Sequence, residues 1–427
     1  MYNYYSGIIW KIDVVLLFST IFFAGVILLY SVLKEHSEKK HQSRLLNIKK
    51  HVYTLLVSGD TENTARLKFP PLTTHDFLDI VINRSRDMTF FNEAEQKTLK
   101  ERFSTPKNIT KIEKTAKRSW YKWRRIEALL CLGYIGNPSA LAILEKSLQS
   151  RNADVAYFSI VALSQIKTSQ SATILLRFLR KDAVNRQGII SVLESFPKEI
   201  VSVAIPILDD KDPYVRIAII GLIGKFKTED CGEKIEKIAL EDKSGEVRAA
   251  ACTCLGSFGN EQYTKTLTTS LNDTFWLVKT EAAKALSKIL GGRCIPIIIK
   301  LAKDSSWSVI ESIKEMMARH IQASLPYIEK FLREDDPVTS RASVEALGSS
   351  GYTINILKDV LHGKGDIKKR ADLILTGIVK TNFHFVLESA LKNLDIDSRD
   401  RILTIIGAVN KSVSDKLSKQ ITEGLDA

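Results

Sequence analysis

The segment Ser244–Gly259 reads SGEVRAAACTCLGSFG and decides the fold class. It begins with turn residues, continues with small and apolar residues at helical spacing, and ends in glycine. DPYVRIAIIGLIGKF (Asp212–Phe226) precedes it and FWLVKTEAAKALSKI (Phe275–Ile289) follows it. One helix therefore recurs about every 31 residues, a period typical of repeat proteins.

The same frame extends over most of the chain when Arg248 is taken as position zero. The zero positions are Arg125, Ala156, Arg186, Arg216, Arg248, Lys279, Ile310, Ser340, Lys368 and Arg399. Positions +3, +4, +7 and +10 form one apolar helical stripe, with Lys314, His320 and Asp372 as polar exceptions. A shorter apolar segment, such as Glu233–Leu240, precedes each frame. The repeating unit is thus predicted to be helix, turn, helix.

EVRAAACTCLGSFG, YVRIAIIGLIGKF and VKTEAAKALSKIL resemble HEAT repeats, in the short bacterial form also called phycobilisome-lyase-like. The resemblance covers roughly residues 105–427. It implies an all-α solenoid of about ten helix pairs that share one continuous core. It also implies a role in binding proteins, because this family mostly does so. A HEAT-like lyase or a nucleic-acid-binding HEAT protein is the alternative.

A row of aspartates stands six residues before the zero position, namely Asp210, Asp242, Asp273 and Asp304. Such a row could suggest catalysis or a metal. Each Asp also lies just before a second helix, where it can cap the helix or pair with the helix's Arg. We therefore interpret the row as a structural ladder.

The N-terminal segment Val14–Leu33 reads VVLLFSTIFFAGVILLYSVL and contains no charge. Twenty apolar residues suffice for a helix to cross a bilayer. The cations that follow it predict that the C-terminal part lies in the cytoplasm. We expect a single-pass protein of the inner (cytoplasmic) membrane, with an anchor at 1–33, a helical connector at 34–104 and a solenoid at 105–427.

The connector region is strongly basic. The chain of 427 residues has a formal net charge of +13, and residues 34–125 hold 21 Lys/Arg against 11 Asp/Glu. Each cation near anionic lipid contributes about 1 kcal/mol of binding. The candidate lipid contacts are Lys34, Lys39, Lys40, Arg44, Lys117 and Arg118.

A second basic run, Lys111–Arg125, also contains Trp120, Tyr121 and Trp123. Three interpretations stay open for this run. It can form the first helix pair of the solenoid with its aromatic rings in the core, lie against lipid headgroups, or stack on nucleic acid bases. We favour the helix pair.

The exposed face of the second helices is the expected protein-binding surface. Positions +1 and +9 of the frame supply a polar row with two tyrosines, which we expect to be exposed. The candidate partner-binding residues are Tyr134, Tyr157, Gln165, Gln187 and Lys225. Tyrosine is favoured at protein interfaces, so the two tyrosines near the N-terminal end of the row are the leading candidates for contact with a partner.

No catalytic motif accompanies the repeats. The sequence contains no phosphate-binding loop, nucleophile elbow or metalloprotease motif, and none of its seven His is followed by Glu. The five Cys form no C-x-x-C pair and read as buried residues. We expect no enzyme, cofactor, metal or small-molecule substrate. We expect a membrane-anchored scaffold that binds a protein, with an envelope polysaccharide glycosyltransferase as the suggested partner and nucleic acid disfavoured by a solenoid of low net charge.

Overall fold

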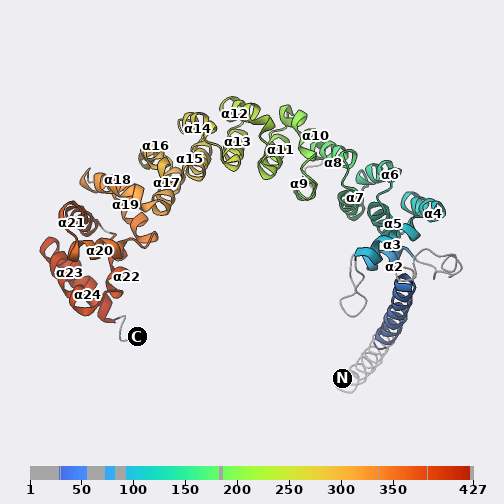
Figure 1. Ribbon diagram of the computed structural model, residues 1–427, viewed down its shortest axis with the longest axis horizontal. Helices are drawn as coiled ribbons and strands as arrows, with labels where there is room; N and C mark the ends of the chain where they lie inside the picture. The colour runs from blue at the N-terminus through green and yellow to red at the C-terminus, as the bar shows by residue number, and fades with distance from the viewer. Residues whose placement is uncertain are drawn as a thin grey trace, which may run out of the picture. The chain divides into compact units, whose positions relative to one another are not determined.

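The computed structural model describes residues 28, 30–54, 73–81, 93–181, 186–334, 336–381 and 383–423 (Figure 1). Regular structure in these residues is entirely helical, so the predicted all-α class is confirmed for them. The chain divides into two compact units, Met1–Phe196 and Pro197–Ala427. This division falls inside the predicted solenoid, and the predicted domain limits near residues 33 and 104 stay predictions.

The N-terminal unit begins with a helix over residues 30–54, followed by α2 (Thr74–Val81) and α3 (Glu93–Phe103). A small apolar core joins these three helices, made of Leu45, Ile48, Val52, Ile80 and Leu99. Buried Asp76 of α2 holds the first helix, because Arg44 Nη2 lies 3.1 Å and His41 Nδ1 3.4 Å from its carboxylate oxygens. The connector is therefore helical in its described part and tied to α2.

Most of the predicted membrane anchor, Val14–Leu33, lies outside the described residues. Within the described part of the chain, no helix has both the length and the apolar character needed to span a bilayer. Leu28, Tyr30, Val32 and Leu33 are described, and all four side chains are exposed.

Helix pairs fill the rest of the N-terminal unit. They are α4 (Pro106–Arg118) with α5 (Lys122–Ile135), α6 (Ala140–Leu148) with α7 (Ala153–Ile166), and α8 (Ser169–Lys181) with α9 (Arg186–Leu193). The second helices α5 and α7 pack directly on each other, as the apolar stripe predicts. The contact is close because a Cβ on Gly133 would collide with the Ala162 backbone.

The C-terminal unit continues the pattern. Its first five pairs are α10 (Ile200–Ala204) and η1 (Ile205–Asp209) with α11 (Pro213–Phe226), η2 (Glu229–Cys231) and α12 (Gly232–Glu241) with α13 (Gly245–Phe258), η3 (Glu261–Tyr263) and α14 (Thr264–Ser270) with α15 (Trp276–Leu290), η4 (Gly291–Cys294), α16 (Ile295–Ile298) and η5 (Ile299–Lys303) with α17 (Trp307–Arg319), and α18 (Ile321–Glu334) with α19 (Pro337–Ser349). The last elements are α20 (Thr353–His362), α21 (Gly365–Lys380), α22 (Phe385–Lys392), α23 (Ile396–Val409) and α24 (Lys411–Glu423). In Figure 1 the second helices α11, α13, α15 and α17 follow one another along one side of this unit, and α12, α14 and α16 along the other.

Local signals in the sequence set the ends of the second helices. The side chains of Asn152, Asp212 and Ser244 accept backbone N–H groups at the N-termini of α7, α11 and α13. Gly259 ends α13 with φ +78°, a left-handed conformation that glycine adopts without strain. The quoted segment Ser244–Gly259 thus contains one complete capped helix.

The regular stacking changes after α19. Up to that point each second helix packs on the next, from α11 through α13, α15, α17 and α19. Beyond it, α21 packs against α18, and α22 packs against α19. The interval between the zero positions Ser340 and Lys368 is 28 residues, the shortest in the frame, and Asp372 breaks the apolar stripe of α21. The irregular sequence therefore coincides with an irregular packing of helices.

The other two polar exceptions have partners. Lys314 Nζ lies 2.6 Å from Glu311 and 2.9 Å from Glu345, so two carboxylates compensate its charge. The His320 ring bonds Ser287 Oγ of the preceding repeat at 2.8 Å. Burial lowers the pKa of His320, and the nearby Arg319 adds to this effect. Both residues therefore connect adjacent repeats.

Candidate functional site

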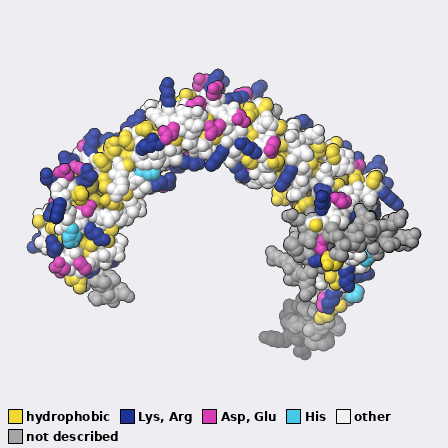
Figure 2. All heavy atoms as spheres, viewed as in Figure 1, with side chains coloured by type: hydrophobic (Ala, Val, Ile, Leu, Met, Phe, Trp, Pro, Cys, Tyr) yellow, Lys and Arg dark blue, Asp and Glu magenta, His cyan; other side chains and the backbone are white. Residues whose placement is uncertain are grey.

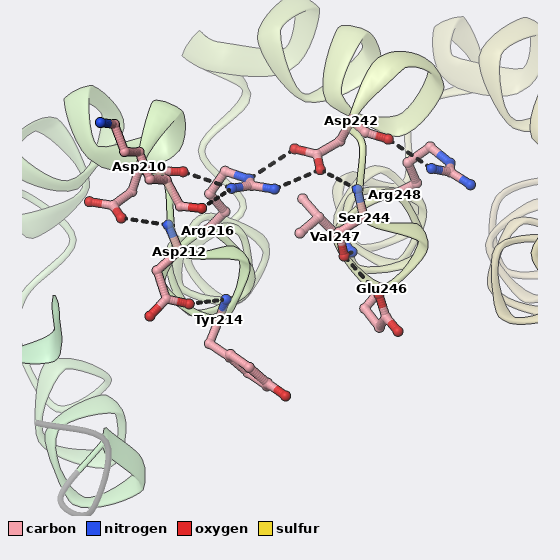
Figure 3. Close-up of polar contacts among 10 residues, drawn as sticks. Asp210, Asp212, Tyr214, Arg216, Asp242, Ser244, Glu246, Val247 and Arg248 are labelled. Atoms are coloured by element: carbon pink, nitrogen blue, oxygen red, sulfur yellow. Dashed lines mark hydrogen bonds and ion pairs between the residues drawn. The ribbon is translucent and has the colours of Figure 1, made fainter.

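The aspartate row forms a ladder between repeats in the C-terminal unit (Figure 3). Arg216 donates from Nε and Nη2 to both oxygens of Asp242, at 2.9 and 2.7 Å. Arg248 does the same to Asp273, at 2.7 and 2.8 Å. Lys279 Nζ reaches Asp304 at 2.6 Å. Each cation thus pairs with the aspartate that precedes the next second helix, whereas we had expected pairing within one repeat.

Each aspartate also shapes the turn that begins its own second helix. Asp210, Asp242, Asp273 and Asp304 each accept the backbone N–H two residues on, at 2.8 to 2.9 Å. The backbone carbonyls of Asp210 and Asp242 accept Nη1 of Arg216 and Arg248, both at 2.7 Å. These groups are therefore occupied with holding the fold, as the structural interpretation of the row predicts.

The ladder is shielded from water. The side chains of Arg248 and Asp273 are 14% and 13% exposed. Burial by itself would raise the pKa of Asp273, but the hydrogen bonds from Arg248 and from the Phe275 N–H outweigh it, so the pKa is lowered. The pKa of Asp304 is lowered in the same way, by Lys279 and the Ser306 N–H acting against burial. Both aspartates therefore stay ionised at neutral pH.

Close packing between second helices holds the exposed surface in place. A Cβ on Gly256 of α13 would lie 2.7 Å from the Ala285 Cβ of α15, which is closer than real Cβ contacts. Ser257 Oγ donates to the Gly224 carbonyl of the preceding repeat at 2.9 Å. Side chains on this face are therefore presented by rigid, closely spaced helices, an arrangement that suits the binding of a partner.

The structure places most of the predicted partner-binding residues at the surface. Tyr157 of α7 is 50% exposed, and Gln165, Gln187 and Lys225 are exposed as well. Tyr134 is an exception to the expectation of two exposed tyrosines, because it is half-buried and burial raises the pKa of its hydroxyl. Lys225 lies in the C-terminal unit, and the other four candidate residues lie in the N-terminal unit.

The predicted lipid contacts divide into two groups. Lys34, Lys39, Lys40, Lys117 and Arg118 are exposed at the surface of the N-terminal unit. Arg44 instead directs its guanidinium to buried Asp76, so it holds α2 against the first helix. The Arg44 side chain is 40% exposed while it pairs with Asp76, and its predicted lipid contact stays a prediction.

The run Lys111–Arg125 does form the helix pair α4 and α5, but its aromatic side chains are not in the core. Trp120 is 95% exposed, and Tyr121 and Trp123 are both 47% exposed. They occupy the turn between the helices and the first turn of α5, ahead of the apolar stripe that begins at Ile126. Their position in the frame, rather than their apolar character, decides their exposure.

Further exposed aromatic residues, which the frame as drawn from the sequence did not include, lie at the same place in later repeats. Tyr214, Trp276 and Trp307 lie in the first turns of α11, α15 and α17 and are 67%, 41% and 54% exposed. Tyr214 projects away from the ladder in Figure 3. Positions −2 and −3 of the frame carry these side chains, so extending the frame three residues toward the N-terminus would have found them.

Charges are mixed over the C-terminal unit. Figure 2 shows basic and acidic side chains interspersed over this unit in the view shown.

All five Cys are described, and all five are buried and unpaired. Within the described residues, no group of three His, Cys, Asp or Glu could hold a metal ion.

Residues 109–194 and 232–318 match the family model for HEAT repeats, so the chain contains HEAT repeats in both units. No curated protein matches the sequence.

Three of the solved structures similar to the chain span a range of proteins. An engineered protein is 17% identical, with a TM-score of 0.32, over 75% of this chain and 99% of that chain. A chain of the CpcE–CpcF complex of phycocyanin lyase from Nostoc sp. is 18% identical, with a TM-score of 0.23, over 57% and 100%. Importin beta is 10% identical, with a TM-score of 0.38, over 93% and 67%.

Proposed function

We propose that this protein is a membrane-anchored scaffold that holds a protein partner on the exposed face of its HEAT repeats in the cytoplasm. The observation that carries the proposal is the set of exposed aromatic side chains on rigid second helices, including Tyr157, Tyr214 and Trp276. Aromatic residues dominate the energetics of protein interfaces.

The proposed place of action is the inner membrane. Val14–Leu33 supplies the anchor, and the cations that follow it favour a cytoplasmic location for the repeats. Lys34, Lys39 and Lys40 lie exposed on the first helix, where they can approach anionic headgroups. A reporter that is active only outside the cytoplasm, fused to the C-terminus, should stay inactive. Activity would overturn the orientation.

The proposed partner is itself an envelope component, and a glycosyltransferase that makes a surface polysaccharide is our suggestion. The role is non-enzymatic, in that the scaffold positions the partner and performs no chemistry of its own. A partner near the bilayer is favoured because the anchor limits how far the first repeats can move from it.

Affinity capture from detergent-solubilised membranes tests the scaffold role. The full chain should retain one partner reproducibly, and Tyr157→Ala with Gln165→Ala should reduce recovery at least about tenfold, since truncating a hot spot commonly has an effect of this size. Lys265→Ala, at an exposed position of the first helix α14, is the matched control and should not change recovery. Equal recovery with both sets of variants would place the binding surface elsewhere, and absence of any partner would refute the scaffold.

A further inference from the structure

A cleft of about 590 Å³ lies in the C-terminal unit where the regular stacking of second helices ends. Its walls come from α17 and α19 and the residues just before them, and include Trp307 and Val338. Phe383, just before α22, closes it. Here α22 packs against α19, and Phe383 contributes its ring to the lining. The cleft therefore lies where the order of helix packing changes.

Arg341 of α19 is the central polar group of the cleft. Its guanidinium carbon lies 5.1 Å from the ring centroid of Trp307 and 4.9 Å from that of Phe383. Its Nε donates to Glu345 at 2.8 Å. Two rings and one hydrogen bond thus fix the plane of the guanidinium, while its two terminal amino groups donate to no other described residue. The side chain is 44% exposed, so these amino groups remain accessible.

The carboxylates around Arg341 are already occupied. The second oxygen of Glu345 accepts from Lys314 at 2.9 Å, and Lys314 also holds Glu311 at 2.6 Å. Asp336 caps α19 through the Thr339 N–H, and Asp304 accepts from Lys279. Each of these carboxylates thus has a partner, whereas the two terminal amino groups of Arg341 have none among the described residues, and the group that complements them is an anion.

The charge balance of the lining disfavours a multiply charged anion. The lining residues include three cations, Lys303, Lys314 and Arg341, against four carboxylates, Asp304, Glu311, Asp336 and Glu345. A dianion such as a phosphate monoester would meet repulsion from these carboxylates, whereas a carboxylate fits the paired donors of an arginine. The exposed faces of Trp307 and Val338, 54% and 44% exposed, offer an apolar surface beside the guanidinium.

We propose that this cleft binds a segment of a protein partner in which an Asp or Glu stands next to an apolar side chain. The partner's carboxylate accepts hydrogen bonds from the two terminal amino groups of Arg341. The partner's apolar side chain lies against Trp307 and Val338. The rings of Trp307 and Phe383 both contact the Arg341 guanidinium and orient it before a ligand binds. This pre-orientation reduces the entropy lost on binding. This inference rests on the proposed scaffold function and adds the chemistry of what the scaffold recognises.

Selection from a phage library of random twelve-residue peptides against the full chain tests the proposal. Retained peptides should be enriched in Asp or Glu adjacent to Leu, Ile or Phe. The best peptide should bind Arg341→Lys at least about tenfold more weakly in calorimetry, because lysine keeps the charge but loses the planar pair of donors. Arg319→Ala, which removes an exposed cation of α17 that does not line the cleft, should leave its affinity unchanged.

A double-mutant cycle separates this site from general electrostatics. Replacing the peptide's acidic residue by its amide should weaken binding to the wild type, and should weaken binding to Arg341→Lys by a smaller factor. Equal loss in both proteins, or retained peptides without the acidic and apolar pair, would refute the proposal. A membrane partner recovered equally by the wild type and Arg341→Lys would also refute it, while leaving the scaffold role intact.

Discussion

The replacement Arg248→Ala should destabilise the C-terminal unit by about 3 kcal/mol. It removes two hydrogen bonds to Asp273 and one to the Asp242 carbonyl. The Asp273 carboxylate, in a side chain only 13% exposed, then lacks its counter-ion. Removing one partner of a buried pair costs about 3–5 kcal/mol, and we place this one at the lower end because some water still reaches the pair.

Urea unfolding followed by helical circular dichroism measures the effect. A double-mutant cycle with Asp273→Ala should give a coupling of about 1–3 kcal/mol, since the two side chains contact each other directly. Arg293→Ala removes a salt bridge to Glu261 whose partners are 67% and 59% exposed, and it should leave the unfolding midpoint unchanged. Strict additivity of the Arg248 and Asp273 replacements would refute the role of the ladder.

The pH dependence has a definite sign. Because the pKa of Asp273 is lowered in the folded protein, its contribution to stability is present above the ordinary carboxyl pKa of about 3.9. It is lost as the pH falls through the lower folded value. The difference in midpoint between wild type and Arg248→Ala should therefore narrow below about pH 4. A difference that persists in full at pH 2 would show that the arginine acts through packing and its bond to the Asp242 carbonyl rather than through the Asp273 carboxylate.

Three further predictions concern packing and reactivity. Gly256→Ala should lower the melting temperature, because the added Cβ would lie 2.7 Å from the Ala285 Cβ. Gly221→Ala, where the added Cβ meets nothing within 4 Å, should instead raise stability by up to about 1 kcal/mol. Thermal melts that rank the two variants in the opposite order would contradict the close approach of α13 and α15. None of the five thiols should react with a thiol reagent at pH 8 before unfolding, since all are buried and burial raises the pKa of Cys252 to about 12; fast labelling of the folded chain would show local opening. Lys314→Met should destabilise the C-terminal unit by about 2 kcal/mol, because it leaves Glu345 and Glu311 without their shared cation. Adding Glu345→Gln should restore part of the lost stability. Urea titration measures the free energy of unfolding of both variants.

Periodicity predicted the helix pairs because the stripe at +3, +4, +7 and +10 is what each second helix must bury. It did not predict the partners of the aspartates. Which cation reaches Asp273 depends on the offset between stacked repeats, and a one-dimensional frame contains no such offset. Aromatic character predicts a core position for Trp123, because large apolar side chains usually lie in the core, yet its side chain is 47% exposed. In this position the first turn of the helix precedes the buried stripe.

The candidate surface could be predicted only in part for the same reason. Gln165 and Lys225 lie at frame positions that face solvent in any regular stack, and both are exposed. Tyr134 occupies an equivalent position and is half-buried. Exposure of a large side chain depends on its neighbours in the adjacent repeat as well as on its own helix. A single-helix frame therefore predicts the exposure of polar residues such as Gln165 and Lys225 better than that of Tyr134.

The polar interruptions of the apolar stripe gain meaning from where they lie. Lys314 and Asp372 stand at stripe positions of α17 and α21, the second helices before and after α19 in the sequence, where the stacking changes. Buried charges add cost unless they are paired, and Lys314 needs two carboxylates to be accommodated. A chain selected for stability alone would favour apolar residues here, as most other repeats have. In the proposed cleft, Lys314 occupies one oxygen of Glu345, while the terminal amino groups of Arg341 stay available for a ligand.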